Sequence, residues 1–565
     1  MLDVVLENYL VFSKPFILLL DSEFLLKSFP TLKTSDLIEI LLDPLTYPHP
    51  VEVITTIETH ISVVFLTGQY AYKLKKPVNF GFLDFSELKQ LQKFCALEVT
   101  LNCRTAPELY LDVYCIVFDN NTRCHYVLPA AETKDHHLII DYLVKMQQFD
   151  PNMVLGRLLR DSKLEFELVA SLTTKITDFH KNAEKAVFNS PFGTPKVQLK
   201  PMLDNFPTLV QYCQRPINKQ KISTLMDWTD QQFLQHETFL IERKKNGFVR
   251  ACHGDLHLDN ITLIEQQPIL FDGIEFNESF RWIDVMSDFA FLLIDLDFRK
   301  QHSASYQALS LYLTQTLDYK GLYLLNFYRV YRTLVRAKIT ALRGLQLPDK
   351  SIQQQQVMDT AEAYIDQAYQ YIQPNSSPKC IILQGVSGSG KSFFANNLLE
   401  KMDNFNAIII SSDRIRKSLF GISHKERLTG EQQTELYSAK MNKKTYNALA
   451  EYSDICLQLG FNVIIDATFL KKQHRQVFQD LAFSHKSNYY QIYIETTNQY
   501  AEQAITERLL LNNNPSDANI DVMSHQQAII EAPTHDEHAL TLQAHDLRKI
   551  FPQQIIQDYL NLPIN

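Results

Sequence analysis

One stretch of the chain has the residue types and the spacing of a phosphate-binding loop. The run Gly385-Val-Ser-Gly-Ser-Gly-Lys-Ser392 fits G-x-x-x-x-G-K-[ST] at every fixed position. The glycines let successive backbone N–H groups point at phosphate oxygens, the lysine neutralises the outer phosphates, and the last serine ligates Mg²⁺. We therefore expect a nucleotide to be held by Gly385, Ser387, Gly388, Ser389, Gly390, Lys391 and Ser392, with Ser392 also bound to the metal.

The elements around this loop must place it at the end of a parallel strand. Cys380 to Gln384 predicts a short buried strand, and Phe393 to Glu400 predicts a helix whose N-terminus faces the anion. Further along this half we predict three strands and one long helix, at 407–413, 461–466, 490–495 and 431–459. Because strands alternate with helices, the expected fold class is α/β, with a doubly wound parallel sheet.

Acidic and basic side chains follow two of these strands. Asp466 ends one strand, where an acid approaches the Mg²⁺ beside a phosphate-binding loop. Asp413 and Arg416 share a face of the next helix's first turn, at the ligand end of the sheet. With the loop, these residues resemble P-loop kinases of the zeta-toxin and polynucleotide-kinase group, over residues 379 to about 540.

That resemblance implies roles for individual residues. Asp413 would activate a substrate hydroxyl, Arg416 would bind substrate or phosphate, and Arg508 would be a lid arginine that stabilises transition-state charge. Arg475 is a weaker candidate for a phosphate contact. A helix cap is the alternative role for Asp413, because aspartate caps helices well.

A second group of chemically capable residues lies in the first half of the chain. Arg250-Ala-Cys-His-Gly-Asp-Leu-His-Leu-Asp-Asn260 precedes two apolar stretches and then Asp272-Gly-Ile-Glu275. This order predicts a loop, two strands and an acidic loop, so that Asp255, Asn260 and Asp272 converge. Kinase-type phosphoryl transfer needs one carboxylate on the acceptor hydroxyl, and an amide and a carboxylate to hold Mg²⁺.

The motif His253-Gly-Asp-Leu-His-x-x-Asn260, followed by Phe271-Asp272, resembles the aminoglycoside phosphotransferase family, the small-molecule branch of the protein-kinase fold. The resemblance covers roughly residues 31–370. It implies that Asp255 is the catalytic carboxylate, that Asn260 and Asp272 are metal ligands, and that the two histidines of the motif shape the loop. The chain has no G-x-G-x-x-G, and Asp272-Gly lacks the phenylalanine of protein kinases, which favours small-molecule kinases.

The same resemblance assigns a lysine and a carboxylate upstream. A strand pair is predicted at 61–66 and 69–75, followed by a helix from Phe85 to Asn102. Lys73 is the expected partner of the α/β-phosphates, and Glu98 is the carboxylate that pairs with it. Lys75 is an alternative because it lies on the same strand face. Glu275 is a candidate ligand for a second metal.

The remaining pattern predicts a small β-rich lobe on a larger α-rich lobe, an α+β bilobal kinase-like fold. A hairpin is expected over residues 113–128, and residues 134–250 are expected to be largely helical. Asp284 and Asp288 lie one helical turn apart, hence on one face. The same resemblance implies that an acidic residue here braces the catalytic loop rather than touching substrate. A basic stripe on one helix is formed by Arg329, Arg332, Arg336 and Arg343. Such a stripe predicts a solvated or salt-bridged face, with a docking surface for an anionic substrate or the other domain as the alternative.

Composition limits the class of protein. A chain of 565 residues is too long for one core, so two or three domains are expected. A net charge of −9 and a pI near 6.0 argue against a nucleic-acid or membrane-surface binder. The eight cysteines form no C-x-x-C, which argues against a disulfide framework or a zinc site and for a cytoplasmic protein. No apolar run is long enough to span a membrane.

We therefore expect an extension at 1–30, an aminoglycoside-phosphotransferase-like domain at 31–373, a linker at 374–378, and an AAA-type ATP-binding P-loop domain at 379–565. The order resembles tandem bacterial proteins. Each domain would use ATP and Mg²⁺ to phosphorylate a hydroxyl group of a small molecule. The acceptor and the oligomeric state are not specified by any motif. Two alternatives stay open: a regulatory ATP-binding protein without an acceptor, and a nucleic-acid end kinase with a basic groove beside Arg416 and Arg475.

Overall fold

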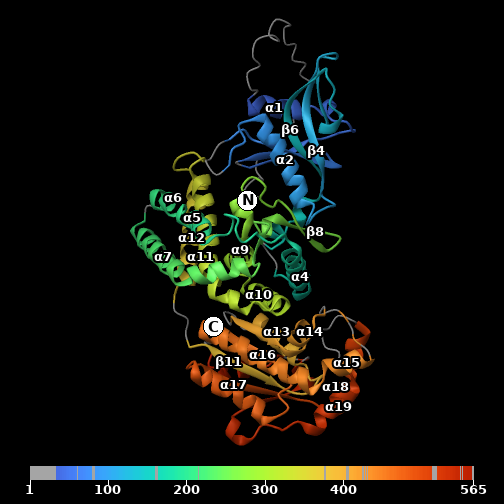
Figure 1. Cartoon of the computed structure of the whole chain (residues 1–565), viewed down its shortest axis with the longest axis vertical. Coiled ribbons are helices and arrows are strands. Elements are labelled where there is room, and N and C mark those ends of the chain that lie inside the picture. Colours follow the sequence, from blue (N-terminus) through green and yellow to red (C-terminus); the bar gives the residue numbers. More distant parts are fainter. Residues whose placement is uncertain are drawn as a thin grey trace.

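The computed structural model describes residues 33–562, apart from short stretches at 60, 79–82, 160–162, 214, 374–376, 402–405, 423–425, 427, 429, 512–517, 548 and 550. The predicted extension at 1–30 and residues 374–376 of the predicted linker lie outside the described residues. Figure 1 shows a β-rich lobe, a helical lobe and a second α/β unit arranged along the long axis. The predicted fold classes, α+β and bilobal followed by α/β, are confirmed.

Six described strands form an antiparallel sheet in the first lobe, in the order β1-β2-β3-β6-β4-β5. Helix α1 packs on one face, where Leu37 and Leu41 join Phe65. Helix α2 packs on the other face, where Leu91 and Cys95 lie in a separate cluster. The elements are α1 (Thr34–Leu41), β1 (Thr55–Glu58), β2 (Ser62–Leu66), β3 (Tyr70–Lys75), α2 (Leu88–Asn102), β4 (Tyr110–Asp119), β5 (Cys124–Pro129) and β6 (His137–Gln147).

Strand β6 corrects the expectation that residues 134–250 are largely helical. It lies between β3 and β4, so it is a central strand of the sheet. Two consecutive residues of β6, Leu143 and Val144, are both fully buried. Leu143 lies in the cluster under α1, and Val144 lies in the cluster under α2. A strand covered on both faces has a continuous apolar run instead of alternation, and periodicity cannot distinguish such a run from a buried helix.

The second lobe is helical, with two short strand pairs. Strand β7 (Val249–Ala251) pairs with β10 (Trp282–Asp284), and β8 (Ile261–Ile264) pairs with β9 (Gln267–Leu270), all antiparallel. The predicted strand–turn–strand after the catalytic motif is therefore present. The helices are α3 (Leu155–Leu158), α4 (Phe166–Asn182), α5 (Pro195–Leu203), α6 (Phe206–Tyr212), α7 (Pro216–Lys245), α8 (Glu278–Arg281), α9 (Val285–Phe298), α10 (His302–Thr316), α11 (Leu322–Gly344) and α12 (Ile352–Tyr371).

The stripe on α11 was predicted to be a solvated or salt-bridged face. Three of its arginines are buried, so the solvated alternative is wrong for them, and Arg336 makes an ion pair. Arg329, Arg332 and Arg336 are 2%, 3% and 9% exposed, and Arg343 is half-buried. Arg332 donates to the carbonyls of Ser287 and Gly254, and Arg336 approaches Asp259 at 3.8 Å. Helix α11 packs inside the lobe, and the acceptors that these cations need come from elements distant in the sequence.

Five described strands form the parallel sheet of the C-terminal unit, in the order β12-β13-β11-β14-β15. Two core clusters cover its faces, one with α16 and α17 and the other with α13 and α21, so the sheet is doubly wound. The elements are β11 (Lys379–Gln384), α13 (Lys391–Lys401), β12 (Ala407–Ser411), α14 (Ser412–Phe420), α15 (Gly430–Leu436), α16 (Ala439–Gln458), β13 (Asn462–Asp466), α17 (Lys472–Ser484), β14 (Asn488–Glu495), α18 (Asn498–Leu511), α19 (Ile520–Ile529), β15 (Leu540–Gln543), α20 (Ala544–Leu547) and α21 (Gln553–Tyr559).

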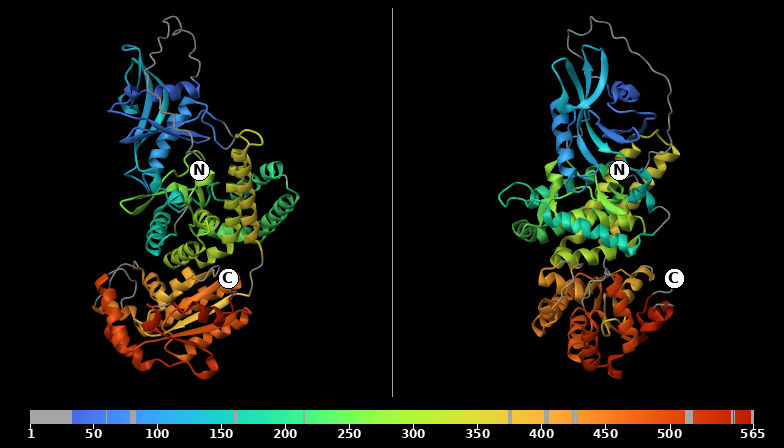
Figure 2. Two further views of the ribbon diagram at one scale, coloured as in Figure 1. Left: turned by 180° about the vertical axis from the view of Figure 1, so that it is seen from behind. Right: turned by 90° about the vertical axis from the view of Figure 1, so that its right-hand side faces the viewer.

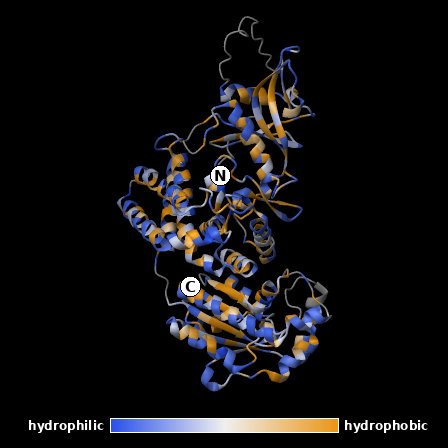
Figure 3. Ribbon diagram, viewed as in Figure 1, coloured by the Kyte–Doolittle hydropathy of each residue, from blue (hydrophilic) through white to orange (hydrophobic). Residues whose placement is uncertain are grey.

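Two details differ from the sequence expectation. The long helix predicted at 431–459 is two helices, because Ser438 caps the start of α16 with a hydrogen bond from Met441 N. Strand β15 was not predicted. It has only four residues and joins an edge of the sheet. Figure 3 shows the hydrophobic residues concentrated in the strands of both sheets.

Helix α10 joins the two halves of the molecule. Both views in Figure 2 show the helical lobe resting on the C-terminal unit. Leu309 and Leu313 of α10 share one core cluster with Ile408 and Ile410 of β12. The ring of Tyr319 stacks on that of Tyr452 at 4.1 Å. The two halves thus share an apolar interface. Among the described helices, none combines the length and apolar character needed to cross a membrane.

Candidate active sites

The N-terminal site is built around Glu98, which is fully buried on α2. Lys73 Nζ lies 2.7 Å from Glu98 Oε1 and 2.5 Å from Asp272 Oδ1. Lys75 contacts the second oxygen of Glu98 and also Glu275. Both lysines therefore reach the same carboxylate from one face of β3. Lys73 is the one in contact with Asp272.

At most groups of this cluster, the charged partners shift the pKa more than burial does. Burial lowers the pKa of Lys73, but Asp272 and Glu98 raise it well above its ordinary value. Burial raises the pKa of Glu98, but the two lysines bring it down to about 2. Burial dominates at Glu275 and raises its pKa despite Lys75. The Asp272 side chain is 36% exposed, so the cluster keeps one carboxylate with an open side.

The catalytic-motif loop is held closed by its own side chains. Asn260 Nδ2 donates to the carbonyl and to Oδ2 of Asp255, both at 2.9 Å. His257 Nε2 lies 3.3 Å from the same Asp255 oxygen. Burial raises the pKa of Asp255, but His257 outweighs it and the pKa lies well below its ordinary value. Asp255 is therefore ionised at neutral pH.

Asn260 and Asp272 are brought together by the β8–β9 hairpin. Ile261 pairs with Leu270, and Phe271 N donates to the Asn260 carbonyl at 3.0 Å. Asp272 follows at once, with φ +62°, a left-handed conformation uncommon outside glycine. Its N–H donates to the Tyr110 hydroxyl at 3.0 Å. Tyr110 has no sequence signal of its own, and only the fold shows that it holds this turn.

The donor set at this point suits Mg²⁺. Because Asn260 turns its amide nitrogen to Asp255, its Oδ1 is buried and has no hydrogen-bond partner among the described residues. An amide oxygen and a partly exposed carboxylate are oxygen ligands of the kind that Mg²⁺ prefers. The residues therefore fit a metal held by Asn260 and Asp272.

Helix α9 braces the loop at both ends. Asp288 accepts the N–H groups of His253 and Gly254, and Asp295 accepts that of Leu258 at 2.9 Å. Asp284 has another role: it caps α9 and pairs with the buried Arg243 at 2.6 Å. Of the two aspartates expected to brace the loop, Asp288 is the one that touches it.

The phosphate-binding loop adopts the conformation that its glycines permit. Gly385, Gly388 and Gly390 have φ of 153°, 85° and 91°. A Cβ on Gly388 would lie 2.6 Å from the Ala501 carbonyl, whereas a Cβ on Gly390 would meet nothing within 4 Å. Lys391 Nζ donates to the Val386 carbonyl at 2.8 Å. The loop has an open side at Gly390 and a closed side against α18.

The strand order puts Asp466 beside this loop. Asp466 pairs with Leu383 across β13 and β11, and its Oδ2 accepts the Ser392 hydroxyl at 2.6 Å. Burial raises the pKa of Asp466, and Lys391 acts in the opposite direction. A hydroxyl and a carboxylate again form an oxygen-only donor pair that fits Mg²⁺.

The acceptor side of this unit is formed by α14 and α16. Arg416 Nη1 lies 2.7 Å from Asp413 Oδ1, and Nη2 lies 3.3 Å from Asn442 Oδ1. The expected pair on the first turn of α14 is therefore present. The sequence did not single out Asn442 or Arg414. Burial lowers the pKa of Arg414 to about 10, while Asp466 and Asp413 act in the opposite direction.

Two other candidates stand apart from this site. Arg475 is 1% exposed and is bound at both sides of its guanidinium by Glu537, so its prediction as a phosphate contact was wrong. It fastens α17 to the segment after α19. The side chain of Arg508 lies outside the described residues, and its lid role stays a prediction.

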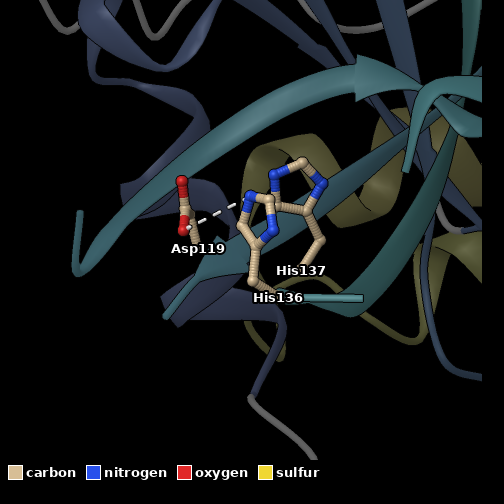
Figure 4. A group of neighbouring side chains, drawn as sticks. All are labelled: Asp119, His136 and His137. Carbon is tan, nitrogen blue, oxygen red and sulfur yellow. Dashed lines mark ion pairs between the residues drawn. The ribbon is translucent and has the colours of Figure 1, made fainter. Parts of the chain in front are cut away.

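A third polar group lies at the far end of β4 (Figure 4). Asp119 Oδ1 lies 4.0 Å from His136 Nε2 and accepts the N–H of Asn121 at 2.8 Å. His137 Nδ1 accepts the N–H of Lys134 at 3.2 Å, so the neutral ring carries its proton on Nε2 and has no second lone pair to offer. These contacts secure the ends of β4 and β6, roughly 30 Å along the strand from Tyr110.

Comparison with known proteins finds one family model, several relatives and several similar solved structures. A family model described as an AAA domain (AAA_33) matches residues 380–533. Uncharacterized proteins of Mycobacterium tuberculosis (strain H37Rv) and Mycobacterium bovis are each 26% identical over 425 residues, 75% of this chain and 80% of each relative. A choline/ethanolamine kinase family protein from Mesorhizobium loti aligns with 59% of this chain and 93% of its own, at 10% identity and a TM-score of 0.35. The APS kinase of Mycobacterium tuberculosis, solved with AMPPNP and APS, aligns with 33% of this chain and 99% of its own, at 20% identity and a TM-score of 0.24.

The family match and the two sites define a class. The chain has a two-domain, kinase-like architecture, and residues 380–533, which match the AAA domain model, contain the phosphate-binding loop.

Proposed function

We propose that the chain is a phosphotransferase with two ATP- and Mg²⁺-dependent sites, each directed at a hydroxyl group of a small molecule. The two catalytic units are residues 31–373 and 379–565. The observation that carries the proposal is the N-terminal geometry: Asn260 binds Asp255 with its amide nitrogen and keeps Oδ1 unpaired within the described residues, next to the turn of Asp272. A kinase requires one carboxylate to orient the acceptor hydroxyl, and an amide and a second carboxylate to hold the metal, and these three groups can take those roles.

At the N-terminal site, each residue has one task. Lys73, oriented by Glu98, would contact the phosphates, and Asn260 and Asp272 would hold Mg²⁺. The metal, when bound, neutralises charge on the transferred phosphoryl group. Asp255 would orient the acceptor hydroxyl and accept its proton. With its pKa below the ordinary range, Asp255 is a weak base that takes the proton late, as suits a loose transition state.

At the C-terminal site, backbone N–H groups and Lys391 would bind the phosphates, while Ser392 and Asp466 would hold the metal. Asp413, whose side chain is 31% exposed, would receive the acceptor hydroxyl. Arg416 would hold Asp413 in place and supply positive charge to the acceptor. Arg508 remains the proposed lid arginine.

The alternatives have less support. A nucleic-acid end kinase called for a basic groove beside Arg416 and Arg475, and the commitment of Arg475 to Glu537 weighs against it. A regulatory ATP-binding protein without an acceptor needs neither Asp255 nor Asp413 to be oriented. The contacts that hold these two carboxylates favour transfer.

The test is transfer from labelled ATP to a metabolite extract. Wild type, Asp255→Asn, Asp413→Asn and the double variant are compared, with the exposed Asp349→Asn as control. Each single variant should lose one set of labelled products by about 100-fold or more while ATP binding persists, because general-base groups contribute that much. If the double variant labels the same products as wild type, both catalytic carboxylates are wrongly assigned. ADP formation with no labelled product would favour the regulatory alternative.

A further inference from the structure

A chain of buried hydrogen bonds runs from the N-terminal catalytic loop to the helix that meets the P-loop domain. Asp288 accepts the backbone N–H groups of His253 at 3.0 Å and Gly254 at 2.8 Å. His180 Nε2 lies 3.1 Å from Asp288 Oδ2, and the Tyr312 hydroxyl lies 2.9 Å from His180 Nδ1. Asp288, His180 and Tyr312 are 0%, 3% and 0% exposed. This chain of hydrogen bonds through Asp288, His180 and Tyr312, called the relay below, therefore crosses the core of the helical lobe.

The chemistry of the groups sets the direction of each proton. Backbone N–H groups only donate and an ionised carboxylate only accepts, so His180 donates to Asp288 from Nε2. When the proton lies on Nε2 alone, Nδ1 is an acceptor, and Tyr312 donates its hydroxyl proton to it. Burial raises the pKa of Asp288, but the hydrogen bond from His180 and the charge of Arg332 act in the opposite direction, and the pKa lies below its ordinary value. Each hydrogen bond on this path therefore has a defined donor and acceptor.

The same cluster does not suit a metal ion. Cys252 lies near His180 and Asp288 at a spacing that a metal could bridge. Its thiol, however, donates to the Ile283 carbonyl at 3.5 Å, and burial raises its pKa well above the ordinary value, so it stays protonated. The group is a hydrogen-bonded support for the loop.

Helix α10 carries Tyr312 on one side and the P-loop domain on the other. Ser310 Oγ accepts the N–H of Ile409, on the edge strand β12, at 2.9 Å. Ser418 of α14 donates to the Thr314 carbonyl at 2.8 Å. Ser310 and Thr314 lie one turn apart, and Tyr312 between them points to the opposite side, since each residue turns the helix by about 100°. Figure 1 shows α10 directly between the two halves.

We propose that His180 and Tyr312 are positioning residues for the N-terminal catalytic loop, and that the P-loop domain helps to hold that loop by clamping α10. Neither residue would touch nucleotide or acceptor. They act through Asp288 on the loop that presents Asp255. The kinetic consequence rests on the proposed function, whereas the effect on loop stability does not.

The first test is hydrogen–deuterium exchange of the full chain, read on the peptide that contains His253 and Gly254. Tyr312→Phe removes the hydroxyl, keeps the ring and leaves His180 Nδ1 buried without a donor. We expect the loop amides to exchange about five- to tenfold faster. The control is Tyr331→Phe, a tyrosine 9% exposed on α11 whose hydroxyl makes no hydrogen bond to the described residues. Exchange equal to wild type in Tyr312→Phe overturns the relay.

The second test concerns the domain contact. The pair Ser310→Ala and Ser418→Ala removes two hydrogen bonds across the interface but leaves the relay residues in place. We expect the same loop peptide to exchange about two- to threefold faster. The exposed Ser484→Ala is the control. If the loop is as protected as in wild type while Tyr312→Phe is not, the contribution of the P-loop domain is refuted.

The third test separates positioning from bare structural support. ADP formation from MgATP is measured in a Lys391→Ala background, so that the N-terminal site is observed alone. His180→Leu should lower kcat about five- to tenfold with the KM for ATP within about twofold, and His180→Gln, which keeps a donor for Asp288, should recover part of the loss. Unchanged kcat in His180→Leu overturns the positioning role. Absence of turnover in the parent counts against the proposed function, and the exchange experiments then decide the relay.

Discussion

The phosphate-binding loop and the N-terminal site differ in how far apart their residues lie along the chain. The loop is one run, Gly385 to Ser392, and binds mainly through its backbone. In the N-terminal site Lys73 contacts Asp272, 199 residues away, and the two come from different lobes. A site built from backbone is specified by local sequence, whereas a site built from side chains depends on how the lobes pack.

The two sites also differ in how they hold their lysines. Lys391 bonds to a carbonyl of its own loop, and its neighbouring carboxylate Asp466 bonds to Ser392. Lys73 and Lys75 are buried among carboxylates that neutralise them. Removing one group from the N-terminal cluster therefore leaves a buried charge without its partner, and the same loss in the phosphate-binding loop mainly affects the ligand.

The largest effect that would test this contrast is expected from Glu98→Gln. This change leaves Lys73 and Lys75 buried with reduced compensation, which should lower the free energy of unfolding by about 3–5 kcal/mol. Both tryptophans, Trp228 and Trp282, belong to the N-terminal half, so urea unfolding followed by tryptophan fluorescence reports on that half. Asp204→Asn breaks the exposed Lys200–Asp204 pair and should change the free energy of unfolding by less than about 1 kcal/mol. Equal effects of the two variants would contradict the contrast.

A smaller effect is expected from Lys391→Ala, which should change nucleotide affinity rather than stability. Loss of a charge-assisted contact to phosphate should weaken nucleotide affinity at the C-terminal site about 100-fold, while the midpoint of urea unfolding changes little. Titration with a fluorescent ATP analogue should show one of two binding phases disappear. The exposed Lys401→Ala, at the end of the same helix, is the matched control. Normal affinity in Lys391→Ala would refute the assignment of the loop.

The smallest expected effect is a pH dependence of the free energy of unfolding. It comes from a carboxyl group of the first lobe that is buried, unlike Glu98, without a cation beside it among the described residues. Asp141 on β6 is 4% exposed, and burial raises its pKa to about 7. A carboxyl whose pKa is higher in the folded state stabilises the fold below its unfolded pKa, and this contribution is lost as the pH rises through the folded value. Between pH 6 and 8.5 the free energy of unfolding should fall by roughly 1.4 kcal/mol, and Asp141→Asn should abolish this change. An equal pH dependence in both proteins would show that another group titrates.

Part of the fold and of the sites could be predicted from sequence, and the parts that could not have physical reasons. The pairs Lys73–Glu98 and Asp413–Arg416 were expected, and the structure places both in contact. The strand character of β6 and the burial of Arg332 were missed. Each depends on which other elements pack against β6 or α11, and an isolated stretch of sequence does not contain that information.

By itself, the sequence determined the elements whose chemistry depends on neighbours within a few residues: the glycine-rich loop, and the turn that brings Asn260 onto Asp255. Backbone geometry and short hydrogen bonds are set locally, so spacing is enough to predict them. Only the tertiary structure decided that Lys73 also contacts Asp272 and that Lys75 contacts Glu275. It likewise decided that His180 links Asp288 to Tyr312, and that α10 lies against the P-loop domain. Those contacts join side chains from different elements, and they exist only when the packing of the core brings the elements together.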